Sequence, residues 1–240
     1  MVSRRRENPI FNVLFNIVIP VVILRNGSEW LDSIDVNALN IHSDSFTFLI
    51  AILFPCIYFV YDLKQKKDIN FIAIIGFLNV LLTGGIGIFG GKLGLSKNWF
   101  IIKEGSLPLT IGLILWGISK YKRAMFNSVL LNDIIFDTDK IKNSLSDNKK
   151  STLDNLSYKA GAYLIIGFFI SSIIQFILAS QIITSNPGEP NFNKEVSTMT
   201  WVSYVAVFLP TVLIVGRGFL KLINGIEDLT GLEKEDFLRA

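Results

Sequence analysis

Two charged residues stand inside an apolar stretch of the sequence. Lys103 and Glu104 lie about one helical turn after Trp99, in WFIIKEGSLPLTIGLILW. A charged side chain within a membrane normally faces a partner or a water-filled cavity, because lipid does not solvate it. Adjacent residues on a helix project about 100° apart. We therefore expect Lys103 to extend outward to the lipid headgroups and Glu104 to need a partner such as an amide or a cation.

Asparagines recur in the first apolar segment. Asn8, Asn12, Asn16 and Pro20 are spaced every four residues and would form one stripe on a helix. Pro20 has no N–H, so the carbonyl of Asn16 loses its helical donor. Such polar groups either line a path for an ion or a small polar solute, or form interhelical hydrogen bonds that fix packing. The candidate intramembrane polar site comprises Asn12, Asn16, Asn79, Lys103 and Glu104.

The stretch LLTGGIGIFGGK contains the spacing G-x-G-x-x-G at Gly85, Gly87 and Gly90. This spacing holds a dinucleotide phosphate only between a strand and a helix of a soluble domain. Here it ends a hydrophobic run, so a packing role is favoured, since glycines let another backbone approach closely. We expect helix packing at Gly84, Gly85, Gly87 and Gly91.

Several kinds of chemistry are disfavoured by residue counts. Cys56 is the one cysteine and His42 the one histidine, so the usual zinc sites and Cys/His catalytic sets cannot be built. A serine and lysine hydrolase would have to use Ser106, three residues after Lys103, and nothing else supports it. We expect no metal, no cofactor and no enzymatic activity.

Composition indicates a membrane protein. Half of the 240 residues are hydrophobic, 18% are charged and the mean hydropathy is +0.48, whereas soluble domains carry about 25% charged residues. The net charge of +3 gives little reason to expect nucleic-acid binding.

Apolar runs predict an all-α polytopic membrane protein. A helix needs about 20 residues to cross the hydrocarbon core, and about six runs approach or reach that length. A cytoplasmic loop at 120–159 contains apolar residues at helical spacing, which predicts an amphipathic helix followed by polar connectors. We expect a single integral membrane domain, 1–240, with spans at 10–24, 46–61, 71–89, 99–118, 160–183 and 199–215.

The distribution of lysine and arginine predicts the orientation. With six spans and a cytoplasmic N-terminus, the outer side receives only Arg25, Lys92, Lys97, Lys103 and Lys194 of the 23 Lys and Arg residues. Cytoplasmic loops carry the excess of these residues, so both termini are expected in the cytoplasm. The basic N-terminus followed by an apolar run is also typical of a signal peptide, but Arg25 directly follows the run, which favours a retained helix.

Five segments carry a family resemblance. NPIFNVLFNIVIPVVIL, FPCIYFVYDL, NVLLTGGIGIFGG, WFIIKEGSLPLTIGLILW and NFNKEVSTMTWVSYVAVFLP resemble, in order, a family of uncharacterised bacterial polytopic membrane proteins. Residues 45–120 are also similar to the intracellular septation protein A family. The resemblance implies a multi-pass inner-membrane protein linked to the cell envelope or to division, with no catalytic residues to carry over.

Two functions are therefore expected. The first is a non-enzymatic inner-membrane protein that acts through helix packing, in cell-envelope maintenance or septation-related assembly. Its partners would be the lipid bilayer and other membrane proteins or further copies of the chain. The alternative is a small carrier or channel for an ion or small polar solute. Convergence of Asn12, Asn16, Asn79 and Glu104 on one water-accessible cavity would favour the alternative.

Overall fold

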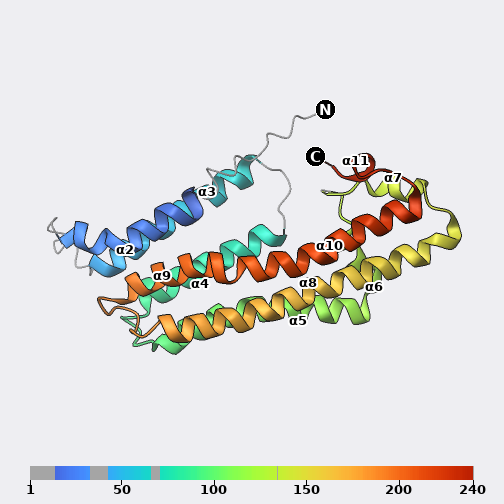
Figure 1. Ribbon diagram of the computed structural model, residues 1–240. Helices are drawn as coiled ribbons and strands as arrows, with labels where there is room; N and C mark the ends of the chain where they lie inside the picture. The colour runs from blue at the N-terminus through green and yellow to red at the C-terminus, as the bar shows by residue number, and fades with distance from the viewer. Residues whose placement is uncertain (1–13, 33–42, 66–70, 134, 240) are drawn as a thin grey trace. The chain divides into compact units, whose positions relative to one another are not determined.

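The computed structural model describes residues 14–32, 43–65, 71–133 and 135–239, and it is all-α (Figure 1). A short π-helix opens the described chain, and Phe136 and Leu238 form an isolated antiparallel bridge. The helices are η1 (Leu14–Val18), α2 (Ile19–Asp32), α3 (Ser43–Gln65), α4 (Phe71–Phe89), α5 (Lys97–Tyr121), α6 (Arg123–Leu130), α7 (Thr138–Asn143), α8 (Asp147–Ile182), α9 (Phe192–Ala206), α10 (Phe208–Thr230) and α11 (Lys234–Phe237).

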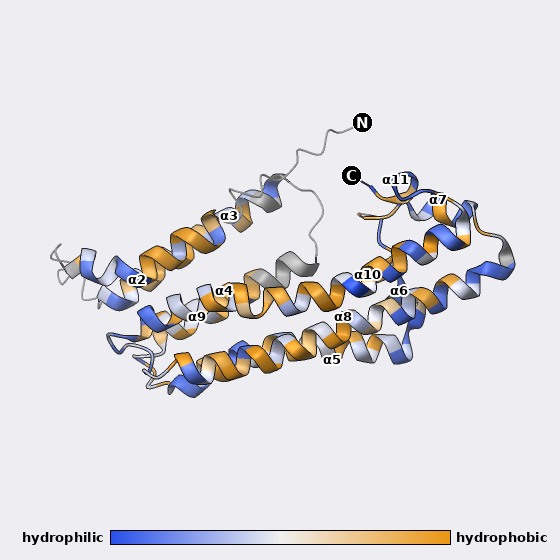
Figure 2. Cartoon of the chain, in the orientation of Figure 1, coloured by the Kyte–Doolittle hydropathy of each residue, from blue (hydrophilic) through white to orange (hydrophobic). Residues whose placement is uncertain are grey.

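The chain is a multi-pass membrane protein. Among the described residues, five helical segments are long and apolar enough to cross a membrane, and the apolar helix Phe77–Phe89 is shorter over its described side chains. Figure 2 shows hydrophobic residues concentrated along α3, α4 and α5 and in the middle of α8. The five segments are Leu14–Leu31, Ser43–Tyr61, Lys97–Tyr121, Asn148–Ile182 and Phe192–Thr230.

Prolines interrupt two of the segments. The π-helical turn of η1 covers Asn16, whose carbonyl loses its usual donor at Pro20, and wider turns of this kind often accommodate a missing bond. The run expected as one span at 199–215 is divided, because α9 ends at Ala206 and α10 begins at Phe208. Pro210 cannot donate to the carbonyl of Ala206 and its ring crowds that carbonyl, which accounts for the break at Val207.

The helix α8 is longer than the apolar run that predicted it. It begins at Asp147, so the second part of the expected loop at 120–159 is helical rather than a polar connector. Leu153 is buried in a hydrophobic cluster, and a Cβ added at Gly225 would lie 2.3 Å from a methyl of Leu156. Leucines three residues apart, with Leu153 buried and Leu156 half-buried, give this extension an apolar face, while its other residues keep the sequence polar. The expected amphipathic helix is present as α6, with Phe126 buried.

The described chain divides into two compact units, each with its own core. The first unit comprises residues 1–105 and 175–205, and the second comprises 106–174 and 206–240. The core of the first unit is aromatic, with Phe192 5.5 Å from Phe100 and 6.2 Å from Phe48 between ring centroids. The second unit has a cluster around Phe136, Phe237, Leu222 and Ile226, and a smaller one around Leu115, Phe126 and Ile165.

Polar segments expected on the outer side contact one another within the first unit. Ser28 donates to Asp44 at 2.6 Å, and the Asn193 amide donates to the Asp44 carbonyl at 3.0 Å. Lys194 pairs with Glu29 at 2.7 Å. The backbone N–H of Lys97, at the start of α5, donates to the Asn186 side chain at 3.0 Å. These bonds connect segments that are far apart in sequence.

Segments expected in the cytoplasm contact one another within the second unit. The backbone N–H of Asp137 donates to the carbonyl of Phe237 at 2.8 Å, and Lys140 pairs with Asp236 at 2.7 Å. Lys149 donates to the carbonyl of Leu229 at 2.8 Å. The C-terminal end of the chain is therefore tied to α7 and to the beginning of α8.

Candidate functional site

The two charged residues of α5 form a buried ion pair. The Lys103 ammonium lies 2.6 Å from Oε1 of Glu104, and the side chains are only 7% and 15% exposed. Both belong to the first unit, and Phe100, one turn earlier, places its ring centroid 4.8 Å from the ammonium. A ring face attracts a cation through its quadrupole. The cation is thus held by a carboxylate and by an aromatic ring of its own helix.

The neighbouring helix α4 supplies two more oxygen atoms. Lys103 donates to Oγ1 of Thr83 at 2.6 Å and to Oδ1 of Asn79 at 3.1 Å. The Thr83 hydroxyl in turn donates to the backbone carbonyl of Asn79 at 2.8 Å. An ammonium carries three N–H donors, and these three oxygens can accept all of them. We call Asn79, Thr83, Lys103 and Glu104 the lysine cluster.

The orientation of Lys103 differs from the sequence-based expectation. The expected outward extension to the headgroups is wrong, because the ammonium turns toward α4 and Glu104. The flexible four-carbon stem of lysine lets the ammonium bend toward the residue next to it, although the two Cβ atoms project in different directions. The expected partner of Glu104 is a cation, and that cation is Lys103.

The asparagine stripe is only partly described. Asn8 and Asn12 lie outside the described residues. Asn16 lies half-buried in η1, which packs against α3 through Phe15, whose ring is 6.2 Å from those of Phe54 and Tyr58. Asn79 belongs to the lysine cluster on α4.

The glycines of α4 differ in their surroundings. A Cβ built on Gly87 would meet the Phe48 ring at 2.5 Å, and one on Gly84 would meet the Ile52 side chain at 2.2 Å. A Cβ on Gly91 would lie 3.0 Å from the backbone of Gly188, whereas one on Gly85 would meet nothing within 4 Å. Close approach of α3 to α4 thus depends on Gly84 and Gly87. Since α4 is helical from Phe71 through Phe89, the G-x-G-x-x-G spacing is not in a strand and helix setting.

Sequence reasoning missed Thr83 as a partner of Lys103. Its signal was present, because Asn79 and Thr83 are four residues apart and lie on one face of a helix. What the sequence lacked was the pairing of this face with Lys103, which lies beyond a glycine-rich turn. Among the described residues, no group of three or more His, Cys, Asp and Glu side chains could hold a metal ion.

The chemistry of the lysine cluster is that of a satisfied cation. A lysine that acts as a general base needs a free lone pair, whereas Lys103 donates to a carboxylate, a hydroxyl and an amide oxygen. No protein-family model, curated protein or solved structure matches the chain.

Proposed function

We propose that the chain is a non-enzymatic multi-pass protein of the bacterial inner membrane that works through helix packing and membrane partners, in envelope maintenance or septation-related assembly. One observation carries the proposal: the intramembrane cation donates to Asn79, Thr83 and Glu104 at 2.6–3.1 Å. A polar group used to bind a passing solute needs unsatisfied bonding capacity, while the three N–H donors of the Lys103 ammonium are matched by these three oxygens. The cluster joins α4 to α5 and stabilises their packing.

The expected orientation belongs to the same proposal, with both termini cytoplasmic. It is supported by the hydrogen bonds of Asp44 with Ser28 and Asn193, which join segments assigned to the outer side by their low lysine and arginine content. A reporter enzyme that is active only in the cytoplasm, fused after Ala240, is expected to be active. Activity of a periplasmic reporter at the same position would contradict the orientation.

A cell-based experiment tests the role. In a bacterium depleted of the protein, we expect weakened envelope integrity, measured as sensitivity to detergent, and restoration by the native chain. Glu104→Gln keeps a neutral acceptor for Lys103, so it is expected to restore integrity whenever the protein accumulates. An unaltered envelope after depletion would overturn the proposed role.

A carrier for an ion or small polar solute is the second candidate. The break at Val207 between α9 and α10 favours it, because carriers bind substrates at interrupted helices within the membrane. Polar side chains stand near the break on α9, where Ser203 donates to Oε1 of Gln175 at 3.0 Å. Ser203 and Gln175, rather than the asparagine stripe, would then be the candidate solute-binding residues.

Liposomes distinguish the two functions. Purified protein is reconstituted and tested for proton flux and small-solute flux, with the native chain, Glu104→Gln and Gln175→Leu in parallel. The packing role predicts traces identical to those of protein-free liposomes for all three chains. Flux through the native chain that falls in either variant would replace the packing role by transport.

A further inference from the structure

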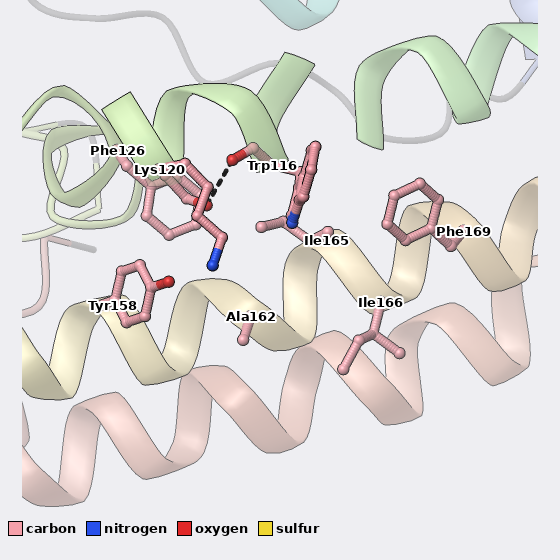
Figure 3. Close-up of a pocket in the computed structure, with 9 residues that line it drawn as sticks. Trp116, Lys120, Phe126, Tyr158, Ala162, Ile165, Ile166 and Phe169 are labelled. Atoms are coloured by element: carbon pink, nitrogen blue, oxygen red, sulfur yellow. Dashed lines mark hydrogen bonds between the residues drawn. The ribbon is translucent and has the colours of Figure 1, made fainter. Parts of the chain in front are cut away.

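A cavity of about 270 Å³ lies in the second unit, between the end of α5, α6 and α8 (Figure 3). Its inner wall is apolar and comes mainly from α8, with Ala162, Ile165, Ile166 and Phe169, while α6 contributes Phe126. Phe126 is fully buried and belongs to the same hydrophobic cluster as Ile165. An apolar wall of this kind suits a hydrocarbon chain better than a polar solute.

The rim of the cavity combines aromatic and basic side chains. Trp116 and Lys120 of α5 and Tyr158 of α8 line it, and Trp116 and Lys120 are exposed. Arg123, at the start of α6, places its guanidinium 4.5 Å from the Tyr158 ring centroid and donates to Asn155 at 2.5 Å. The Arg123 side chain is thus oriented beside the rim while remaining exposed.

The charge at the rim has one sign. None of the nine lining residues is acidic, and Lys120, Lys122 and Arg123 fall within four positions at the junction of α5 and α6. The Asp154 carboxylate of α8 does not line the cavity and accepts from the Asn127 amide at 3.2 Å. An anion that entered the rim would therefore meet cations that no lining carboxylate neutralises.

The residue types at the rim fit the depth where headgroups are found. The apolar run of α5 ends at Trp116 to Tyr121, and tryptophan and tyrosine concentrate at the boundary between membrane and water. Basic pockets between membrane helices on the cytoplasmic side recognise anionic headgroups. Apolar walls below a basic rim match a molecule that has hydrocarbon at one end and negative charge at the other.

We propose that this cavity binds an anionic phospholipid, with an acyl chain against Ala162 and Ile166 and the headgroup phosphate against Lys120 and Arg123. Arginine suits this role because its planar fork matches two phosphate oxygens. A zwitterionic phospholipid offers the same acyl chains and a phosphate, but its choline cation offsets the charge of that phosphate. Inorganic phosphate offers only the charge. The proposal stands independently of whether the chain transports a solute.

Tryptophan fluorescence tests the proposal on the full chain. Replacing Trp30, Trp99 and Trp201 by phenylalanine leaves Trp116 as the only tryptophan, and Trp116 lines the cavity. The chain is reconstituted in phosphatidylcholine vesicles that contain a minor fraction of brominated phosphatidylglycerol or of brominated phosphatidylcholine. We expect stronger quenching by the anionic lipid, and an affinity preference that falls about fivefold for each cation removed.

Three variants separate the contributions of the rim cations and of the apolar wall to the lipid preference. Lys120→Gln with Arg123→Gln is expected to make quenching by the two lipids equal, while Lys142→Gln, an exposed cation of α7 outside the cavity, retains the preference. Ala162→Leu fills the apolar wall and is expected to reduce the preference with both rim cations present. Equal quenching of the parent chain, or a preference that survives loss of both cations, would overturn the proposal.

Inorganic phosphate distinguishes the two sources of negative charge. We expect millimolar phosphate at constant ionic strength to leave the quenching by brominated phosphatidylglycerol unchanged, since the acyl chain supplies part of the affinity. If phosphate alone abolishes the preference, the site binds a bare anion and the lipid assignment is overturned.

Discussion

Lys103 of the first unit and the cations beside the cavity of the second unit have opposite surroundings. In the first unit Lys103 is buried and donates to three oxygens. In the second unit Lys120 and Arg123 are exposed beside a cavity, and no carboxylate lines that cavity. Two buried oxygens of the second unit, Oδ1 of Asn127 and Oγ of Ser157, also have no hydrogen-bond partner among the described residues.

This difference follows from where each cation lies along its helix. Lys103 is in the apolar part of α5, where lipid provides no hydrogen-bond acceptor, so the protein must supply the acceptors itself. Lys120 is at the end of the same helix, where water and headgroups can do so. A satisfied cation fixes packing, whereas an exposed one keeps bonding capacity for a ligand.

Removing the buried cation Lys103 is expected to cause the largest loss in the free energy of unfolding. Lys103→Met leaves the Glu104 carboxylate without its partner and Thr83 and Asn79 without their shared donor. Breaking a buried pair in this way costs about 3–5 kcal/mol. Chemical unfolding in detergent micelles measures the loss. Lys92→Met, at an exposed lysine after α4, is the control and should leave stability unchanged.

The next largest loss in the free energy of unfolding is expected from adding a side chain at a tightly packed glycine of the same unit. Gly87→Ala is expected to cost about 1–3 kcal/mol, because the added Cβ would overlap the Phe48 ring, which is itself fully buried. Gly85→Ala is the matched control two residues earlier, where a Cβ meets nothing within 4 Å. The same unfolding measurement compares them, and equal losses would contradict close packing of α3 against Gly87.

A smaller loss of stability is expected when the Lys140–Asp236 ion pair of the second unit is broken. The hydrogen bond from Lys140, aided by the backbone N–H of Glu233, holds the pKa of Asp236 below its usual value. The stabilisation is therefore complete above the unfolded pKa of about 3.9 and disappears as the pH falls through the lower folded value. Limited proteolysis of the C-terminal segment measures it.

Asp236→Asn serves as the matched variant for that pH dependence. It should make the C-terminal segment easier to cleave at neutral pH and remove the change in cleavage rate below about pH 4. Asp228→Asn, an acidic residue of α10, is the control and should retain that change. An unchanged pH dependence in Asp236→Asn would assign the stabilisation to another group.

The smallest effect is expected at the rim of the cavity. Lys120→Gln should change the free energy of unfolding by no more than about 0.5 kcal/mol, because the side chain is exposed. Unfolding in micelles of a zwitterionic detergent measures it without an anionic ligand. A loss as large as that of Lys103→Met would show that Lys120 stabilises the fold as much as the buried Lys103 does.

Sequence patterns predicted the helices well where hydrophobicity decides their limits. The third span was expected at 71–89, and α4 occupies Phe71–Phe89. The all-α polytopic fold was also predicted correctly. The extension of α8 back to Asp147 was missed, because its length depends on burying Leu153 against residues of α10, which lie far away in sequence.

Only part of the candidate site was predicted, because the rest depends on contacts between segments that are far apart in sequence. Asn79, Lys103 and Glu104 were singled out because a polar side chain in an apolar run is visible from sequence alone. The direction of Lys103 depends on which helix face lies beside it, and no local pattern encodes that. The cavity was also missed, since its walls come from α5, α6 and α8 and consist of ordinary apolar residues.

A double-mutant cycle between Lys103 and Glu104 measures whether the two charges stabilise each other in the folded protein. The free energy of unfolding is measured in micelles for the native chain, Lys103→Met, Glu104→Gln and the double variant. If the two charges stabilise each other, the double variant loses less than the sum of the single variants, with a coupling energy of about 1–3 kcal/mol. Additive losses would contradict a stabilising ion pair, because Lys103 and Glu104 would then act independently.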